Sequence, residues 1–528
     1  LANKLGADPS NQVLVIEAGP MDRNLMIHIP AGVYNAWRNP KWNWNYTAEA
    51  QENLGGKSIF MPRGRIVGGS SSINSMVYMR GHPKDFDGWA DDFDLPAWRY
   101  ENCLPYFKAG EAYAKGGNFW RGDSGPLGVS PGTYDNPLYD AFIESGEQAG
   151  QGRTDDPNGA NPEGLARLDA TRRDGRRCSA AVAHLRPALK RGNVQLMTDT
   201  TVLRVLLSGK TAVGVGVSRK GKAVKIEGGQ VILSGGAINS PQVLMLSGIG
   251  PADHLDRHGI SAVHHLPGVG QNLMDHANVI LQFRSQKQFP IHRVDRPWNK
   301  LAAGARWVFT RDGAAASNIW EAGGLIRGND HVPYANLQYH FGPVGFEYVG
   351  EKIQLSQAFA IHVDQLRPRS RGQITLNSTD PFAKPRLDFN YLAHPKDLQE
   401  IVEGVKKTRD LVAQSAFAEL AGAEMEPGSD VQTDQDIARW ISHNLETDFH
   451  PCGTCAMGHG DQAVVDDEFR VRGIDGLHVV DASTFPRITS ANLNAPTQML
   501  ATRAADYIMG QPQMRPMLVA TYPTKILN

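Results

Sequence analysis

Residues 12–16, QVLVI, form the short apolar run that most constrains what this chain can fold into. The run follows an Asp-Pro-Ser-Asn turn and is rich in β-branched residues, which predicts a buried strand. Glu17 stands directly after it. In dinucleotide-binding βαβ units the second strand ends in an acid that accepts hydrogen bonds from the adenosine ribose. Residues 12–17 therefore favour such a unit, with the alternative that Glu17 merely ends a strand.

A G-x-G-x-x-G turn should precede this strand, and the given chain does not contain it. Residues 214–216 and 268–270 have paired glycines, but neither is a strand-to-helix turn followed by an acid about 20 residues later. We expect a complete protein of this kind to have roughly 20 to 30 further residues at the front, enough for the strand and the glycine turn.

The composition narrows the class of protein. For 528 residues, a domain size of about 150 gives three to four domains, or two large ones. A net charge of −1 argues against a broad affinity for nucleic acid. Four cysteines fit a reducing compartment, and no apolar run reaches the length of about 18 residues that a membrane span needs. We expect a cytoplasmic location, with peripheral membrane contact left open.

The secondary-structure pattern changes along the chain. Short strands between residues 195 and 233 favour a β-meander that leads back into a sheet. From about 280 to 445, aromatic-rich strands and a helix at 395–413 predict a separate domain with an antiparallel sheet. Residues 477–482 then return to a buried strand that leaves an acid at its end. The other predicted strands cover residues 195–197, 202–207, 212–217, 230–233, 335–341, 358–365 and 373–376.

Two glycine-containing stretches are candidates for a binding site. Residues 64–81, GRIVGGSSSINSMVYMRG, would let the backbone approach phosphates or a flat ring closely, or would form a flexible linker. Residues 236–250, GAINSPQVLMLSGIG, follow a strand and predict a helix start, with Ser240 as N-cap and Pro241 in the first position.

Two later stretches add polar groups. Residues 450–458, HPCGTCAMG, contain a Cys-x-x-Cys pair, but Cys103 and Cys178 stand alone, so the four ligands of a zinc site are missing and we predict no metal. Asn494 and Pro496 open a helix after Asp481 and Ala482. The N-terminus of that helix would stabilise an anion.

Taken together and in this order, the four stretches resemble the glucose–methanol–choline (GMC) oxidoreductase family of FAD enzymes, and the first two match its signature patterns position by position. The resemblance extends from Glu17 to about Met509. It is strongest towards choline dehydrogenase-like members, on residues 317–328, 366–381 and 449–458.

The resemblance implies an α/β fold with α+β elements, in which a Rossmann-like FAD-binding domain is interleaved with a substrate-capping domain built on an antiparallel sheet. We expect the FAD-binding domain at residues 1–155, 190–285 and 446–528, and the substrate-binding domain at residues 156–189 and 286–445.

The resemblance also implies a reaction. A primary alcohol would be oxidised to the aldehyde by hydride transfer to flavin N5, with His450 as general base and Asn494 as its partner. Imidazole can accept the hydroxyl proton near neutral pH, and an amide can hold the developing alkoxide. The alternatives are an alcohol oxidase that uses O2, a non-redox enzyme of the hydroxynitrile-lyase type, and a flavin-binding protein without turnover.

Non-covalent FAD is the implied cofactor, because Ile73 stands where some relatives have the histidine that attaches it. Glu17 and Ala18 would meet the adenosine, Val202 the adenine, and Asp481 and Ala482 the ribityl–diphosphate part. The remaining residues expected to bind FAD are Arg63, Gly68, Gly69, Ser72, Asn74, Met76, Val77, Gly236, Asn492, Pro496 and Thr497.

The implied substrate is choline-like or a small aliphatic alcohol. A choline site needs an acid, or aromatic faces within about 6 Å of the ammonium group. The candidates are Trp320, Glu321, Phe341 and Phe449. Asp448, two positions before His450, could raise the pKa of His450, reduce reactivity with oxygen, or turn away into a salt bridge. The electron acceptor could be a quinone, a dye-like molecule or O2.

Overall fold

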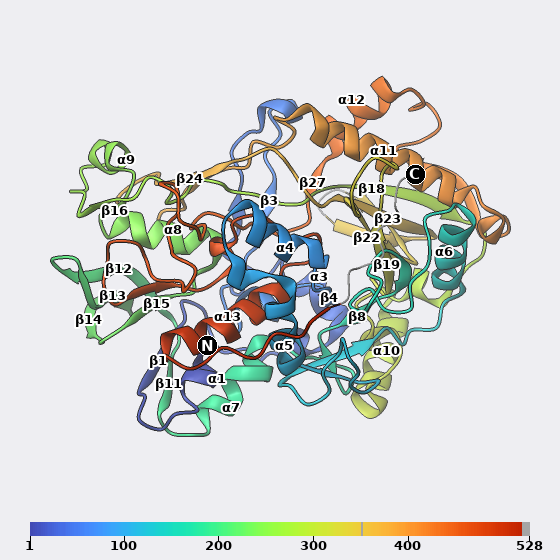
Figure 1. Cartoon of the computed structure of the whole chain (residues 1–528). Helices are drawn as coiled ribbons and strands as arrows, with labels where there is room; N and C mark the ends of the chain where they lie inside the picture. The colour runs from blue at the N-terminus through green and yellow to red at the C-terminus, as the bar shows by residue number, and fades with distance from the viewer. Residues whose placement is uncertain (350–351, 520–528) are drawn as a thin grey trace.

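A computed structural model describes residues 1–349 and 352–519 of the chain (Figure 1). It is a mixed assembly of helices, parallel strand pairs and one large antiparallel sheet. The predicted α/β fold is confirmed. None of the helices in the described part of the chain is both long and apolar enough to cross a membrane.

The predicted dinucleotide-binding strand is β1 (Val13–Ile16), which pairs in parallel with β11 (Val194–Met197). A second parallel pair joins β15 (Val231–Leu233) to β28 (Leu477–Val479). The predicted meander is the antiparallel sheet of β12 (Thr200–Ser208), β13 (Thr211–Arg219) and β14 (Lys222–Glu227). Sequence reasoning did not predict β14, because its side chains are almost all exposed and show no apolar period.

The helix predicted after Ser240 begins earlier. Helix α8 (Gly236–Leu246) includes Pro241 in its interior. Proline cannot donate to the carbonyl four residues before it, and this normally breaks a helix. Here that carbonyl, of Ala237, accepts a hydrogen bond from the Thr454 hydroxyl at 2.6 Å. The replacement donor explains why the helix continues, and why Ser240 does not act as its N-cap.

The largest sheet is antiparallel and six-stranded, in the order β19 (Ala322–Ile326), β20 (Leu337–Gly342), β23 (Ala358–Gln365), β18 (Ala277–Ser285), β26 (Ala421–Glu426). The short strand β27 (Glu446–Thr447) also pairs with β18. Both β18 and β27 lie outside the ranges predicted for the substrate domain. The sheet therefore crosses the predicted boundaries at 285/286 and 445/446.

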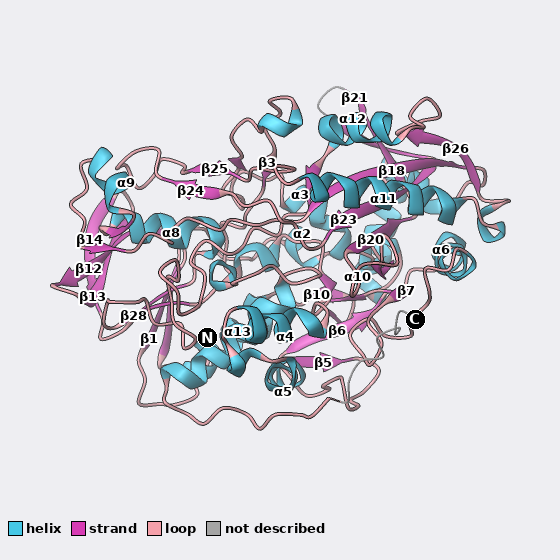
Figure 2. Cartoon of the chain, turned by 45° about the horizontal axis from the view of Figure 1, so that its top comes forward, coloured by secondary structure: helices cyan, strands magenta, loops and turns pink. Residues whose placement is uncertain are grey.

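Helices cover one face of this sheet. Helix α11 (Pro395–Val412) packs on β18, β20 and β23, and α6 (Pro137–Gln148) packs on β19 and β20. Figure 2 shows α11 lying across the strands, next to α12 (Asp434–Asn444). Side chains alternate along a strand, so Tyr339 and Phe341 face these helices. Gln338 and His340 face the opposite side, where the candidate site lies.

The C-terminal helix α13 (Asn494–Ile508) begins at the predicted Asn494 and packs on α5 (Tyr100–Gly110). The other helices are α1 (Ala2–Leu5), α2 (Leu25–His28), α3 (Val33–Ala36), α4 (Pro83–Asp92), α7 (Arg186–Leu189), α9 (Ala252–Arg257) and α10 (Pro297–Thr310). The other strands are β2 (Tyr46–Thr47), β3 (Phe60–Met61), β4 (Val77–Tyr78), β5 (Glu111–Tyr113), β6 (Leu127–Pro131), β7 (Gly164–Arg167), β8 (Asp169–Ala170), β9 (Arg172–Arg173), β10 (Arg176–Arg177), β16 (Ile249–Gly250), β17 (His264–His265), β21 (Gly345–Val349), β22 (Lys352–Ser356), β24 (Gln373–Thr375) and β25 (Arg386–Asp388).

Candidate active site

His450 lies on the loop that follows β27, and a buried carboxylate fixes its backbone. Its amide N–H donates to Asp275 Oδ1 at 2.7 Å. The other oxygen of Asp275 accepts from the hydroxyls of Thr447 and Tyr391. Burial raises the pKa of Asp275 to about 6. Three chain segments meet at this carboxylate, so the position of His450 is tightly determined.

Both ring nitrogens of His450 have hydrogen-bond partners. Its Nδ1 lies 3.0 Å from Nδ1 of His276, whose Nε2 lies 3.1 Å from the carbonyl oxygen of Leu366. A carbonyl only accepts, so His276 carries its proton on Nε2 and presents Nδ1 as an acceptor. Burial lowers the pKa of His276 to about 3, which keeps this ring neutral. His450 therefore donates from Nδ1, and its lone pair is on Nε2.

Asn492 faces this lone pair. Its Nδ2 lies 3.2 Å from His450 Nε2, while its Oδ1 accepts from the amide of Gln338 at 3.1 Å. His340 Nε2 also lies 3.4 Å from that Oδ1. Because donors occupy the oxygen side of the amide, the N–H side points at His450.

The predicted partner Asn494 is not in contact with His450. It is the first residue of α13, and its Oδ1 accepts from the Gln498 amide at 3.1 Å, one turn further along the helix. The structure brings Asn492 to His450 instead, since Asn492 lies in the loop before the helix.

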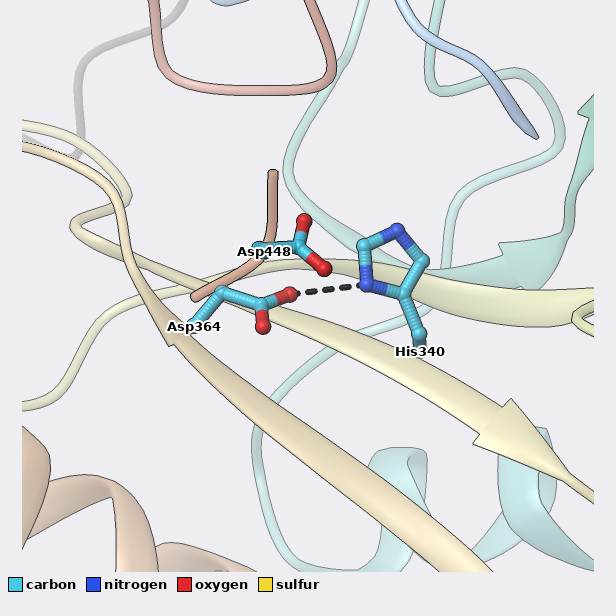
Figure 3. A group of neighbouring side chains, drawn as sticks. All are labelled: His340, Asp364 and Asp448. Atoms are coloured by element: carbon cyan, nitrogen blue, oxygen red, sulfur yellow. Dashed lines mark hydrogen bonds and ion pairs between the residues drawn. The ribbon is translucent and has the colours of Figure 1, made fainter. Parts of the chain in front are cut away.

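His340 forms the other end of the network, together with Asp364 and Asp448 (Figure 3). Its Nδ1 lies 2.7 Å from Asp364 Oδ2. Burial alone would lower the pKa of His340, but the carboxylate of Asp364, which is hydrogen-bonded to the ring, outweighs burial and raises the pKa to about 9. The ligand atoms of the three residues lie within 4.8 Å of one another, the spacing of a metal site. Hydrogen bonds at both nitrogens of His340 account for the cluster without an ion.

Asp448 does not raise the pKa of His450. Its Oδ2 lies 3.2 Å from His450 Nδ1. Burial, with the nearby Asp364, raises the pKa of Asp448 itself well above the usual range, so it favours the protonated form. Burial, with the positive charges of His340 and Arg63 as further causes, lowers the pKa of His450 well below 6.5. His450 is therefore neutral at physiological pH and available as a base.

Hydrogen bonds join several of the segments that are expected to bind the cofactor. The Val67 amide donates to Pro20 at 3.0 Å, which joins the turn after Glu17 to the Gly68–Gly69 loop. The Gly236 amide donates to Asp481 Oδ2 at 2.9 Å, and the Gly453 amide donates to the Ala482 carbonyl at 3.1 Å. Val202 follows Thr200, whose amide donates to the Glu17 carbonyl at 3.0 Å.

Other expected cofactor residues have protein partners. Arg63 donates to the carbonyl of Phe449 at 2.6 Å, and burial lowers the pKa of Arg63 to about 10. Asn74 Oδ1 accepts from Arg177 at 2.7 Å, and the Ser72 hydroxyl donates to the Val67 carbonyl at 2.8 Å. Met76 and Val77 are buried beside them, Pro496 is buried in the first turn of α13, and the Thr497 hydroxyl donates to the Leu493 carbonyl at 2.7 Å.

The comparisons with known proteins agree with the geometry. Two sequence-family models, both described as GMC oxidoreductase, match residues 14–278 and 368–501. The chain belongs to the GMC oxidoreductase family. The oxygen-dependent choline dehydrogenase of Brucella ovis is 43% identical over 515 residues, which cover 97% of this chain and 93% of that protein.

Solved GMC oxidoreductase structures have the same fold. Pyridoxine 4-oxidase from Mesorbium loti superposes with a TM-score of 0.88 at 28% identity, covering 97% of each chain. A variant of formate oxidase from Aspergillus oryzae gives 0.89 at 26% identity, covering 96% of this chain and 95% of that one. These findings confirm the family, FAD as cofactor and FAD-dependent alcohol oxidation as the activity.

The residues fit an FAD group. Gly69 and Gly236 have positive φ angles, and a Cβ atom added to either would meet no atom within 4 Å. Such open backbone lets a large planar or phosphate group approach closely. Glu17 stands at the end of β1, where burial raises its pKa to about 7. A buried carboxyl at that place can hydrogen-bond ribose hydroxyls.

The structure separates the four expected substrate residues. Trp320 packs on His362 at 4.5 Å between ring centroids, on the site face of the sheet, and Phe449 precedes His450 with a φ of 66°. Phe341 is fully buried on the opposite face, stacked on Phe142, and cannot contact a substrate. Glu321 is buried in an ion pair with Arg167 at 2.8 Å, so it is not a free acid for a cation.

Sequence reasoning missed four members of the network: Asp275, His276, His340 and Asp364. The strands that contain His340 and Asp364 are buried on both faces, so no apolar–polar alternation marks the two residues. Their pairing across β20 and β23 is a property of the register. The only available signal was the adjacent Asp275 and His276 before an apolar strand.

Proposed function

We propose that His450 removes the hydroxyl proton of a primary alcohol and that Asn492 holds the alcohol oxygen. The supporting observation is the hydrogen-bond series from Leu366 through His276, which leaves the His450 lone pair on Nε2 facing Asn492. A base in this tautomer needs no rearrangement before it accepts a proton.

When bound, FAD accepts the hydride that leaves the α-carbon of the alcohol. The chain itself supplies the proton acceptor and the charge. Asn492 donates to the oxygen as it becomes an alkoxide, and the positively charged His340 lies directly behind the amide. Both groups act in a buried site, where fixed donors stabilise developing charge strongly.

We further propose a choline-like alcohol as the first candidate substrate, with small aliphatic alcohols next. The names of relatives that cover nearly the whole chain support choline. The ring of Trp320, which packs on His362 on the same face of the sheet as His340, supplies an aromatic face. Glu321 has no part in this proposal.

The names of the relatives and of the structural neighbours also guide the proposal for the electron acceptor. Dehydrogenase activity with a quinone or dye is the main proposal, and oxidase activity with O2 is the alternative that the oxidase names of the structural neighbours favour. We also propose that FAD is bound non-covalently, since Ile73 offers no atom for attachment. The two domains follow the ranges predicted from the sequence, except that β18 and β27 belong to the sheet of the substrate-binding domain. Acid precipitation should release free FAD into the supernatant.

An anaerobic titration tests the function. Alcohols including choline, ethanol and benzyl alcohol are added to the FAD-loaded protein without oxygen, and the flavin absorbance near its visible maximum is followed. We expect at least one alcohol to bleach it, and His450→Ala to slow bleaching by about 100-fold or more while FAD stays bound. No bleaching with any alcohol would refute the redox function, and a hydroxynitrile substrate would then test lyase activity. Readmitted oxygen distinguishes an oxidase, which reoxidises rapidly, from a dehydrogenase.

A further inference from the structure

Helix α10 is amphipathic, but its larger apolar face is turned outward. The helix extends from the lower right edge of the molecule in Figure 1. Its inner contact is Trp307, which is fully buried against Ala315 and Ala316, and its Nε1 donates to the Gly175 carbonyl at 2.7 Å. Trp307 thus fixes which side of the helix faces the protein.

The outward side consists of large apolar residues. Their exposed fractions are 81% for Trp298, 63% for Leu301, 47% for Val308 and 85% for Phe309. Trp298 and Phe309 are the two most exposed large hydrophobic side chains among the described residues. At about 100° per residue, these four side chains, with Ala302 and Ala305, fall within an arc of roughly 120° opposite Trp307. Such an apolar stripe normally faces a partner.

The charged residues of α10 and of the residues that flank it are mainly basic. Residues 293–312 contain Arg293, Arg296, Lys300, Arg306 and Arg311 against Asp295 and Asp312, although the whole chain has a net charge of −1. Asp312 is paired with Arg306 at 2.7 Å. Arg296 and Lys300 are exposed near the first turn of the helix. The positive charge is therefore concentrated on the segment that carries the exposed apolar face, with Lys300 on the polar side of the helix.

We propose that α10 docks the protein onto an anionic lipid surface. Basic side chains pair with lipid phosphates, while Trp298, Leu301 and Phe309 enter the boundary between headgroups and acyl chains. The helix has 14 residues and is about 21 Å long, shorter than the roughly 20 residues that cross a bilayer, so it lies in the membrane plane. The aromatic residues stand at its two ends, where they hold both ends at the interface.

The test is co-sedimentation of the FAD-loaded chain with vesicles of phosphatidylcholine mixed with phosphatidylglycerol. We expect the wild type to pellet with these vesicles at low salt, and less with pure phosphatidylcholine. Trp298→Ala/Phe309→Ala should lower the partition coefficient at least about tenfold, since burial of one large apolar side chain is worth more than a tenfold change. Arg296→Glu/Lys300→Glu should reduce binding to the anionic vesicles specifically.

Phe382→Ala is the matched control, because Phe382 is also 62% exposed but lies far along the chain from α10. It should bind like the wild type, and all variants should keep the wild-type melting temperature and FAD content. Equal binding by the Trp298/Phe309 variant and the wild type would refute the proposal. The proposal would also be refuted if the wild type does not bind the vesicles but forms a dimer, and the Trp298/Phe309 variant is monomeric. A second copy of the chain would then cover this face.

Discussion

At the scale of single residues, the proposed chemistry depends on which ring nitrogen of His450 faces which side-chain atom of Asn492. Two asparagines separated by one residue have different partners: Asn492 contacts His450, whereas Asn494 accepts a hydrogen bond from Gln498 of its own helix. In the stopped-flow reduction of FAD without oxygen, Asn492→Ala should lower the limiting rate at least about 100-fold, the usual cost of losing one donor to a developing oxyanion. Asn494→Ala should change it less than about fivefold. A larger loss of rate in Asn494→Ala than in Asn492→Ala would instead support Asn494 as the partner of His450.

His276 holds the proton of His450 on Nδ1, and its replacement tests this tautomer. His276→Leu removes the acceptor, so His450 can place its proton on Nε2 and lose its basic lone pair at the substrate. We expect a slower limiting rate of reduction, by roughly 10-fold or more, with little change in the alcohol Kd. His276→Asn can still present an oxygen to His450 and should recover most of the rate. Similar losses in both variants would indicate a packing role only.

At the scale of elements, strands β20 and β23 set the charge of the site. Their register places His340 and Asp364 within hydrogen-bond distance, and the resulting pKa of His340 is about 9. His340 is then positive below that pH and supports Asn492, while His450 is neutral above a pKa well below 6.5. The rate of flavin reduction should therefore be level around neutral pH and fall above about pH 9.

Asp364→Asn removes the charge that raises the pKa of His340, and burial then lowers that pKa. The alkaline decrease should move to lower pH in this variant, as measured by the pH profile of the limiting reduction rate. The exposed Asp434→Asn is a control and should leave the profile unchanged. An alkaline limb at the same pH in Asp364→Asn would show that another group titrates.

Strand and motif patterns could be read from the sequence wherever the signal was local. The β1 strand with Glu17, the meander and the start of α13 are examples, because apolar runs and turn residues are local properties. The first residue of α8 could not be predicted from the sequence. The hydrogen bond that Pro241 cannot make is replaced by one from Thr454, which is more than 200 positions away along the chain. The face of the sheet to which Phe341 points could not be predicted either, because it depends on the register of a strand that is buried on both faces.

At the scale of the whole molecule, the site is assembled from distant segments. His450 and Asn492 come from loops near the C-terminus, His276 from the start of β18, and His340 and Asp364 from adjacent strands of the antiparallel sheet. The sequence resemblance indicated the family and the cofactor, and the similarity to known proteins confirms both. It implied Asn494 as the partner of His450, whereas the residue that contacts His450 in the structure is Asn492, two positions earlier. A motif gives the order of residues along the chain and not the conformation of a loop.

The hydrogen bond from His276 to the Leu366 carbonyl also limits where a proton can travel. An amide carbonyl does not pass a proton onward, so the branch from His450 Nδ1 through His276 ends there. The other group near Nδ1 is Asp448 at 3.2 Å, which favours its protonated form and so does not accept a proton readily. A proton taken up at Nε2 must therefore leave from that same nitrogen, on the side where the aldehyde lies. Proton release is then coupled to departure of the product, and a deuterium oxide effect should appear in steady-state turnover even where the chemical step itself is fast.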